Sequence, residues 1–168
     1  HDAGSLEENI RMHLQKAAKS PIDYGLHMNI TRFDQDVAAQ IPKLPQVGIT
    51  SIKVFTAYNG RLRLSDGDIF KVMRIARKHG ILTMVHAENG DIIDILTSEA
   101  LAAGNTTPIW HARTRPGWGE VESSLRAIAI GAQAEAPVYL VHMNVAGEVD
   151  QLAYGRCNGL PVMGETCP

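Results

Sequence analysis

The sequence contains the apolar run Ser51-Ile52-Lys53-Val54-Phe55-Thr56-Ala57-Tyr58, which predicts a buried strand. Lys53 lies inside this run. Because an unpaired ammonium is strongly penalised in a protein interior, this lysine indicates a specific role. Two further predicted strands, 81–86 and 138–142, each end in a histidine. Three nitrogen side chains on three strands are what a metal-dependent hydrolase on a β/α scaffold requires.

Short apolar runs alternate with longer amphipathic stretches along the chain, which predicts βα units and a mainly parallel sheet. A complete eightfold barrel needs about 250 residues, so 168 residues predict a partial (β/α)8 TIM-barrel of about five parallel strands with intervening helices. Asp36 is the expected N-cap of the second helix and Pro42 its limit. The expected strands are 24–31, 51–58, 81–86, 138–142 and 161–165; the expected helices are 6–19, 36–41, 69–78, 91–103, 120–134 and 145–156, with a loop at 106–119.

Composition narrows the class of protein. The chain is 45% hydrophobic, which suffices for the core of one domain, and its net charge of −2 argues against a nucleic-acid or anionic-membrane partner. No apolar run approaches the roughly 18 residues of a membrane span, and no secretory signal is visible. Cys157 and Cys167 are too far apart for a Cys-x-x-Cys motif, so we expect buried free thiols and a cytoplasmic location.

The chemistry of the three nitrogen side chains is specific. In β/α barrels, side chains at the carboxyl ends of strands meet at one mouth, where His86 and His142 are expected. Imidazole suits zinc, whereas an amine such as that of Lys53 serves metals best after it has captured carbon dioxide as a carbamate. Taken singly, the lysine is better explained as an edge or snorkelling residue, and each histidine as a structural one. The three together favour the metal site.

Several longer motifs carry a resemblance to a known family. They resemble, in order and spacing, the central part of a bacterial hydantoinase/dihydropyrimidinase of the cyclic amidohydrolase superfamily, over essentially the whole chain. The matching stretches are Ile22-Asp23-Tyr24-Gly25-Leu26-His27-Met28, Gly48-Ile49-Thr50-Ser51-Ile52-Lys53-Val54-Phe55 with Tyr58, Met84-Val85-His86-Ala87-Glu88-Asn89-Gly90, His111-Ala112-Arg113-Thr114-Arg115-Pro116, Val141-His142 and Gly164-Glu165-Thr166-Cys167-Pro168.

The resemblance implies a role for each candidate residue. Lys53 would be a carbamylated lysine that bridges two metals, and His86 and His142 would be ligands of one of them. Tyr58 would polarise the substrate carbonyl. The implied reaction is hydrolysis of the cyclic amide bond of a hydantoin or dihydropyrimidine by a metal-bound hydroxide, with zinc as the expected divalent metal. A small cyclic amide or imide is then the expected partner.

The chain also departs from the family pattern. It has no His-x-His pair, and the late aspartate of the family would lie beyond Pro168. Met143-Asn144 replaces an expected small hydroxyl residue. We therefore expect residues 1–168 to be a barrel fragment truncated at both ends, inactive alone and with weak or absent metal binding. An allantoinase- or dihydroorotase-type amidase is the alternative within the enzyme class, and a non-catalytic structural homologue is the alternative outside it.

A cut barrel predicts self-association. Its sheet would have helices on one side only, leaving Val54, Met84 and Leu140, or their alternating neighbours, in contact with water. Burial of such side chains contributes on the order of 2 kcal/mol each, so we expect a homo-oligomer. The other candidate contacts are weaker: His111, Arg113 and Arg115 could touch substrate, but a loop-ordering role is favoured, and Glu88 is expected to support His86 or cap a helix.

Overall fold

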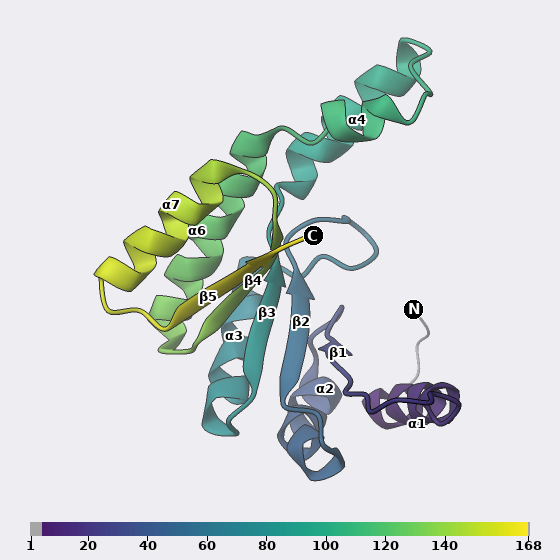
Figure 1. Ribbon diagram of the computed structural model, residues 1–168, viewed down its shortest axis with the longest axis vertical. Coiled ribbons are helices and arrows are strands. Elements are labelled where there is room, and N and C mark those ends of the chain that lie inside the picture. The colour runs from purple at the N-terminus through teal and green to yellow at the C-terminus, as the bar shows by residue number, and fades with distance from the viewer. Residues whose placement is uncertain (1–4, 168) are drawn as a thin grey trace.

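A computed structural model describes residues 5–167 of the chain. Within them the sheet has five strands, all parallel to their neighbours and in the order in which they occur in the sequence (Figure 1). Sequential parallel strands joined by helices are the pattern of a β/α barrel, so the predicted fold class is confirmed. The strands are β1 (Met28–Asn29), β2 (Ser51–Phe55), β3 (Leu82–His86), β4 (Val138–Met143) and β5 (Val162–Thr166).

The helices connect these strands and pack mainly against one face of the sheet. Figure 1 shows α3, α6 and α7 on that side, and α4 projecting beyond the carboxyl ends of the strands. Side chains cap several of the helix starts; for example, Ser65 Oγ accepts from Asp68 N–H and Asn89 Oδ1 accepts from Ile92 N–H. The helices are α1 (Leu6–Ala17), α2 (Gln35–Gln40), the 3₁₀ helix η1 (Ile41–Val47), α3 (Asp66–Lys78), α4 (Gly90–Ala102), α5 (Ile109–Arg113), α6 (Gly117–Ala134) and α7 (Ala146–Cys157).

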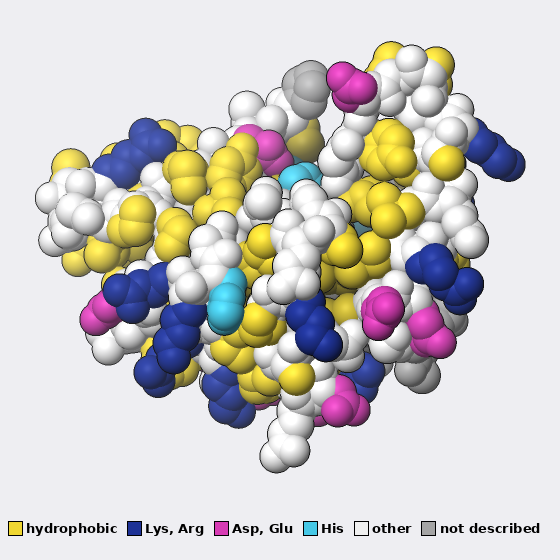
Figure 2. Space-filling view, turned by 90° about the horizontal axis from the view of Figure 1, so that it is seen from below, with side chains coloured by type: hydrophobic (Ala, Val, Ile, Leu, Met, Phe, Trp, Pro, Cys, Tyr) yellow, Lys and Arg dark blue, Asp and Glu magenta, His cyan; other side chains and the backbone are white. Residues whose placement is uncertain are grey.

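The register of the strands separates a covered face of the sheet from an open one. The cross-strand row of Ile52, Thr83, Val138 and Val162 is buried under the helices. The next row, Lys53, Met84, Tyr139 and Met163, is half-buried or exposed. Because side chains alternate along a strand, one whole face is therefore open. Hydrophobic side chains also reach the surface between basic ones when the molecule is seen from below (Figure 2).

The open face consists of other residues than most of those named from the sequence. Met84 is half-buried on it, as expected. Val54 and Leu140, however, are fully buried against the helices. The open face therefore carries Met84 and the alternating neighbours of Val54 and Leu140, which is the alternative that the sequence left open.

Three predicted segments also differ from the structure. The strand expected at 24–31 shrinks to the two residues of β1. The N-cap of α2 is Asp34 rather than Asp36, and Pro42 does not end the helical path, which continues through η1 to Gly48. A proline in the first turn of a helix removes no needed N–H, so the chain passes through Pro42 without a break.

The expected loop at 106–119 contains α5 and the first turn of α6. Pro108 and Pro116 precede these two helices, and a proline fits the start of a helix as well as it fits a loop. Cys157 and Cys167 are free, as expected, but both are exposed rather than buried. In the part of the chain from residue 5 to residue 167, no helix combines the length and apolarity required to cross a bilayer.

Candidate active site

The two histidines at the ends of β3 and β4 lie in direct contact. His86 Nδ1 is 2.8 Å from His142 Nε2, and the ring centroids are 4.7 Å apart. His86 is 7% exposed and His142 is half-buried. The structure thus brings together two of the predicted metal ligands, each through one ring nitrogen.

An irregularity in β4 makes this contact possible. Leu140 faces the helices, so strict alternation would turn His142 toward the helices as well. The register with β5 instead shifts between Leu140 and Met143, and His142 has a left-handed backbone with φ of 44°. Bulges of this kind re-aim side chains near functional sites. The bulge therefore directs His142 to the side occupied by His86.

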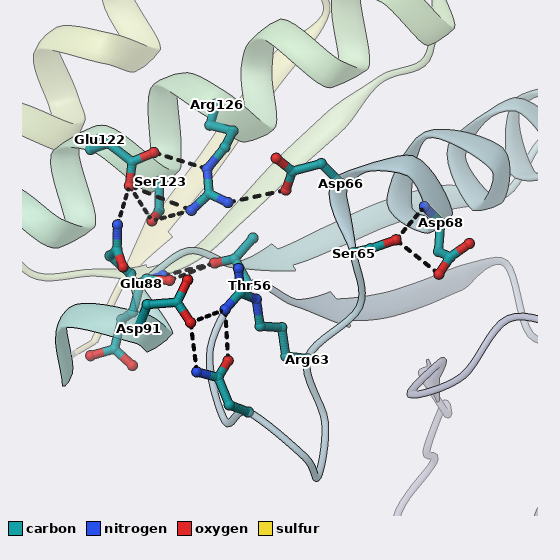
Figure 3. A network of polar contacts seen from close by, with 12 residues as sticks. Thr56, Arg63, Ser65, Asp66, Asp68, Glu88, Asp91, Glu122, Ser123 and Arg126 are labelled. Carbon is teal, nitrogen blue, oxygen red and sulfur yellow. Dashed lines mark hydrogen bonds and ion pairs between the residues drawn. The ribbon is translucent and has the colours of Figure 1, made fainter. Parts of the chain in front are cut away.

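Glu88 holds the second nitrogen of His86. Its Oε2 is 2.6 Å from His86 Nε2, and its Oε1 is 3.5 Å from Arg115 Nε. The main chain of Glu88 is held by the residue that follows β2, because Thr56 Oγ1 accepts from Glu88 N–H at 3.0 Å (Figure 3). A carboxylate on one imidazole nitrogen fixes the ring and leaves the other nitrogen for a ligand. The supporting role expected for Glu88 agrees with this arrangement.

Tyr58 and Lys53 lie beside the histidines. The Tyr58 ring is 5.0 Å from the His86 ring between centroids, and its φ is 67°. Phe55 packs between the two groups, 5.6 Å from the His86 ring and 5.3 Å from Lys53 Nζ. The two histidines and Tyr58 therefore lie together at the carboxyl edge of the sheet, and Lys53 lies in the middle of β2. Tyr58, His86 and His142 line one pocket with Arg115 and His111, whereas Arg113 stacks on Trp110.

The electrostatics of the site favour a neutral His142 imidazole and a protonated Tyr58 phenol. Burial lowers the pKa of His142, and the charges of His86 and Lys53 lower it further. Burial raises the pKa of Tyr58, and the carboxylate of Glu88 adds to this effect. Burial would also raise the pKa of Glu88, but the hydrogen bond and charge of His86, with Arg115, outweigh it and lower the pKa. A neutral imidazole is the form that binds metals.

A pair of carboxyl groups that was not predicted from the sequence lines the same pocket. Glu148, 2% exposed, accepts from Ser124 Oγ at 2.8 Å and from Asn144 N–H at 2.9 Å. Glu120 receives the Asn144 side-chain amide at 3.3 Å. Burial, followed by the hydrogen bond and charge of Glu148, raises the pKa of Glu120 to about 7. Neither glutamate belongs to a recognisable motif, so only the tertiary structure reveals the pair.

This pair predicts a pH-dependent stability. Because the folded-state pKa of Glu120 lies above its ordinary value of 4.5, the folded chain binds the proton more tightly than the unfolded chain. The contribution is complete below pH 4.5 and is lost as the pH rises through about 7. Urea unfolding of Glu120→Gln should show a smaller loss of stability between pH 5 and 8 than the unsubstituted chain. Glu99→Gln, which alters an exposed carboxyl on α4, should leave the loss unchanged; equal slopes for all three would contradict the assignment.

The donors that converge here fit a divalent cation only in part. His86 Nδ1 and His142 Nε2 lie 2.8 Å apart, within hydrogen-bond distance of each other, and Lys53 lies on the strand next to that of His86. Among residues 5–167, no three or more His, Cys, Asp and Glu side chains form a group that could hold a metal ion. Two imidazoles and a lysine are therefore the candidate ligands among the described residues, and they do not make up a complete site.

Several known proteins are similar to this chain over nearly its whole length. A D-hydantoinase from Geobacillus stearothermophilus is 44% identical over 93% of this chain and 33% of its own length. A dihydropyrimidinase from Arabidopsis thaliana is 35% identical over 96% of this chain and 31% of its own length. The crystal structure of dihydropyrimidinase from Brevibacillus agri NCHU1002 superposes with a TM-score of 0.96 at 44% identity, covering 100% of this chain and 37% of the other.

The chain thus spans about a third of the length of the relatives that it matches. An L-hydantoinase from Arthrobacter aurescens, at 22% identity and a TM-score of 0.84, shares the fold. No protein-family model matches the chain. The five strands and their helices accordingly form part of a TIM-barrel fold.

Proposed function

Because this chain is homologous to D-hydantoinases and dihydropyrimidinases over nearly its whole length, we propose that a longer protein containing it hydrolyses the cyclic amide bond of a hydantoin or dihydropyrimidine. Its substrate would be a small cyclic amide or imide. This sequence would contribute part of the active site, and the remainder would come from outside the third of the relatives that it matches.

The contacts of His86 and His142 support the proposed chemistry. His86 Nδ1 faces His142 Nε2, while Glu88 occupies the remaining nitrogen of His86. We propose that a divalent cation, zinc, would take the place of the hydrogen bond between these two nitrogens. A bound cation would supply Lewis-acid polarisation of the carbonyl and activation of a water molecule. We propose Lys53 as a further ligand after its neutral amine adds to carbon dioxide, which forms the N–C bond of a carbamate and releases one proton.

Tyr58 would stabilise the charge that develops on the substrate oxygen. Its raised pKa keeps the phenol protonated, so the O–H can donate a hydrogen bond to the carbonyl oxygen as that oxygen becomes negative. The ring lies over His86, which places the tyrosine beside the proposed cation site. Arg115 lies 3.5 Å from Glu88, so its positive charge compensates the negative charge of the Glu88 carboxylate.

The test separates the isolated chain from the longer protein. We expect the longer protein to hydrolyse hydantoin or dihydrouracil, and the purified chain to hydrolyse neither. Turnover that follows the chain through a size-exclusion column and disappears in Lys53→Ala would contradict the assignment of a partial site.

We also propose that the chain self-associates through its open face in the cytoplasm. Size exclusion with light scattering should therefore give at least a dimer at micromolar concentration. A stable monomer would contradict the self-association.

A further inference from the structure

The loop that carries Tyr58, residues 56–64 between β2 and α3, is held in a strained conformation. Tyr58 has a left-handed backbone, and its carbonyl oxygen accepts from the N–H groups of Arg61, Leu62 and Arg63 at 3.1, 3.0 and 3.3 Å. Strain of this kind persists only where the surrounding structure enforces it, and it clusters at functional sites. Among the described residues, two of the three non-glycine residues with positive φ are Tyr58 and His142. The forces that hold the Tyr58 loop are therefore relevant to the site.

A polar cluster joins this loop to the start of α4. Arg63 Nη1 donates to Asn59 Oδ1 at 2.8 Å and also to Asp91 Oδ1. Asn59 Nδ2 donates to Asp91 Oδ1 at 2.8 Å and to Asp94 Oδ2 at 2.9 Å. Figure 3 shows Arg63 and Asp91 meeting between the loop and the helix. We name Asn59, Arg63 and Asp91 the loop clamp.

Close packing between the start of α4 and the Tyr58 loop also holds these two segments together, without any charged group. A Cβ atom on Gly90, the first residue of α4, would lie 2.9 Å from the Cα of Ala57 and 3.3 Å from the Thr56 carbonyl oxygen. Only glycine allows the helix to approach the loop backbone this closely. Since Glu88 lies two residues before Gly90, the loop, the helix and the support of His86 form one packed unit.

We propose that the loop clamp positions Tyr58 over His86, and that its loss lowers turnover while leaving the contact between the two histidines intact. The catalytic part of this inference rests on the proposed function, whereas the positioning part does not. Asn59, Arg63 and Asp91 are positioning residues that act through Tyr58. Because Asp91 and its partner Arg63 are partly exposed, salt should weaken the clamp.

The positioning is tested in the chain by nuclear Overhauser effects and amide hydrogen exchange. In Arg63→Ala and Asp91→Ala, the effect between the Tyr58 and His86 rings should disappear, and the amides of residues 61–64 should exchange roughly tenfold faster. The His86–His142 contact should remain. Arg77→Ala removes a comparable surface ion pair with Glu135 and should change neither readout. Unchanged ring contacts and exchange in both clamp variants would overturn the proposal.

Two further experiments cover a variant that does not fold and the effect of the loop clamp on catalysis. If a variant does not fold, as judged by circular dichroism, 1 M NaCl applied to the unsubstituted chain should accelerate exchange at residues 61–64 more than in β3, and equal acceleration would overturn the proposal. In the longer protein, Arg63→Ala should lower kcat at least about tenfold with little change in KM or metal content, and Arg63→Lys should recover part of the loss. Faster exchange with an unchanged kcat would refute the catalytic role of the clamp, whereas inactivity of the unsubstituted longer protein would refute only the proposed function.

Discussion

Lys53→Ala, made in a longer protein that contains this sequence, is expected to lower kcat for hydantoin or dihydrouracil hydrolysis by roughly a thousandfold or more. Lys53 lies in the middle of β2, on the open face and beside the aromatic groups that line the site. If its carbamate bridges two cations, removal of the amine withdraws ligands from both and takes several kcal/mol of transition-state stabilisation with it. Steady-state kinetics and metal analysis on the same preparation measure both effects.

A matched lysine and a rescue experiment sharpen this prediction. Lys71→Ala, which removes an exposed lysine paired with Asp68, should leave kcat unchanged. A short carboxylate such as acetate can occupy part of the space left by Lys53 and supply two oxygens, so it should restore some activity to Lys53→Ala alone. Full activity of Lys53→Ala without added carboxylate would show that the lysine is a packing residue of the strand.

Tyr58→Phe is expected to lower kcat by about 10²–10³-fold in the same longer protein. The substitution removes one hydroxyl group and leaves the ring that packs over His86 and against Phe55. The phenol would donate to an oxygen that becomes negative only as the reaction proceeds, so its loss should affect kcat more than KM. Steady-state kinetics with hydantoin and dihydrouracil provide the comparison.

Tyr154→Phe is the control for this experiment, because Tyr154 is 59% exposed on α7. Its kinetics should match those of the unsubstituted protein. A fall in kcat/KM that comes entirely from KM would assign Tyr58 to substrate binding rather than to charge stabilisation. An equal effect of both substitutions would remove Tyr58 from the site.

Much of the fold could be predicted because apolar runs and helix caps are local signals. The run that contains Lys53 and the runs that end at His86 and His142 formed adjacent parallel strands, as their alternation with helices indicated. One weak point was Pro42, which was expected to end a helix. The chain continues through Pro42 into η1, since a missing N–H has no cost in a first helical turn.

The site could be predicted only in part, since its geometry depends on backbone irregularities. The residue types and their strands were predictable, but the positive φ of Tyr58 and of His142 was not. Nothing in the local sequence indicates that β4 would bulge and turn His142 toward His86. The pair of the half-buried Glu120 and the buried Glu148 also depends on contacts between segments far apart in the chain.

We propose that His86 and His142 are metal ligands within an incomplete site. Zinc binding to the isolated chain tests this assignment. Elemental analysis after mild chelation, followed by calorimetric titration with zinc, gives stoichiometry and affinity. We expect at most one weakly held zinc per chain, removable by the chelator, lost in His86→Ala and in His142→Ala and retained in the exposed-residue control His79→Ala. Two tightly bound metals per chain, or binding that survives both histidine substitutions, would contradict the claim.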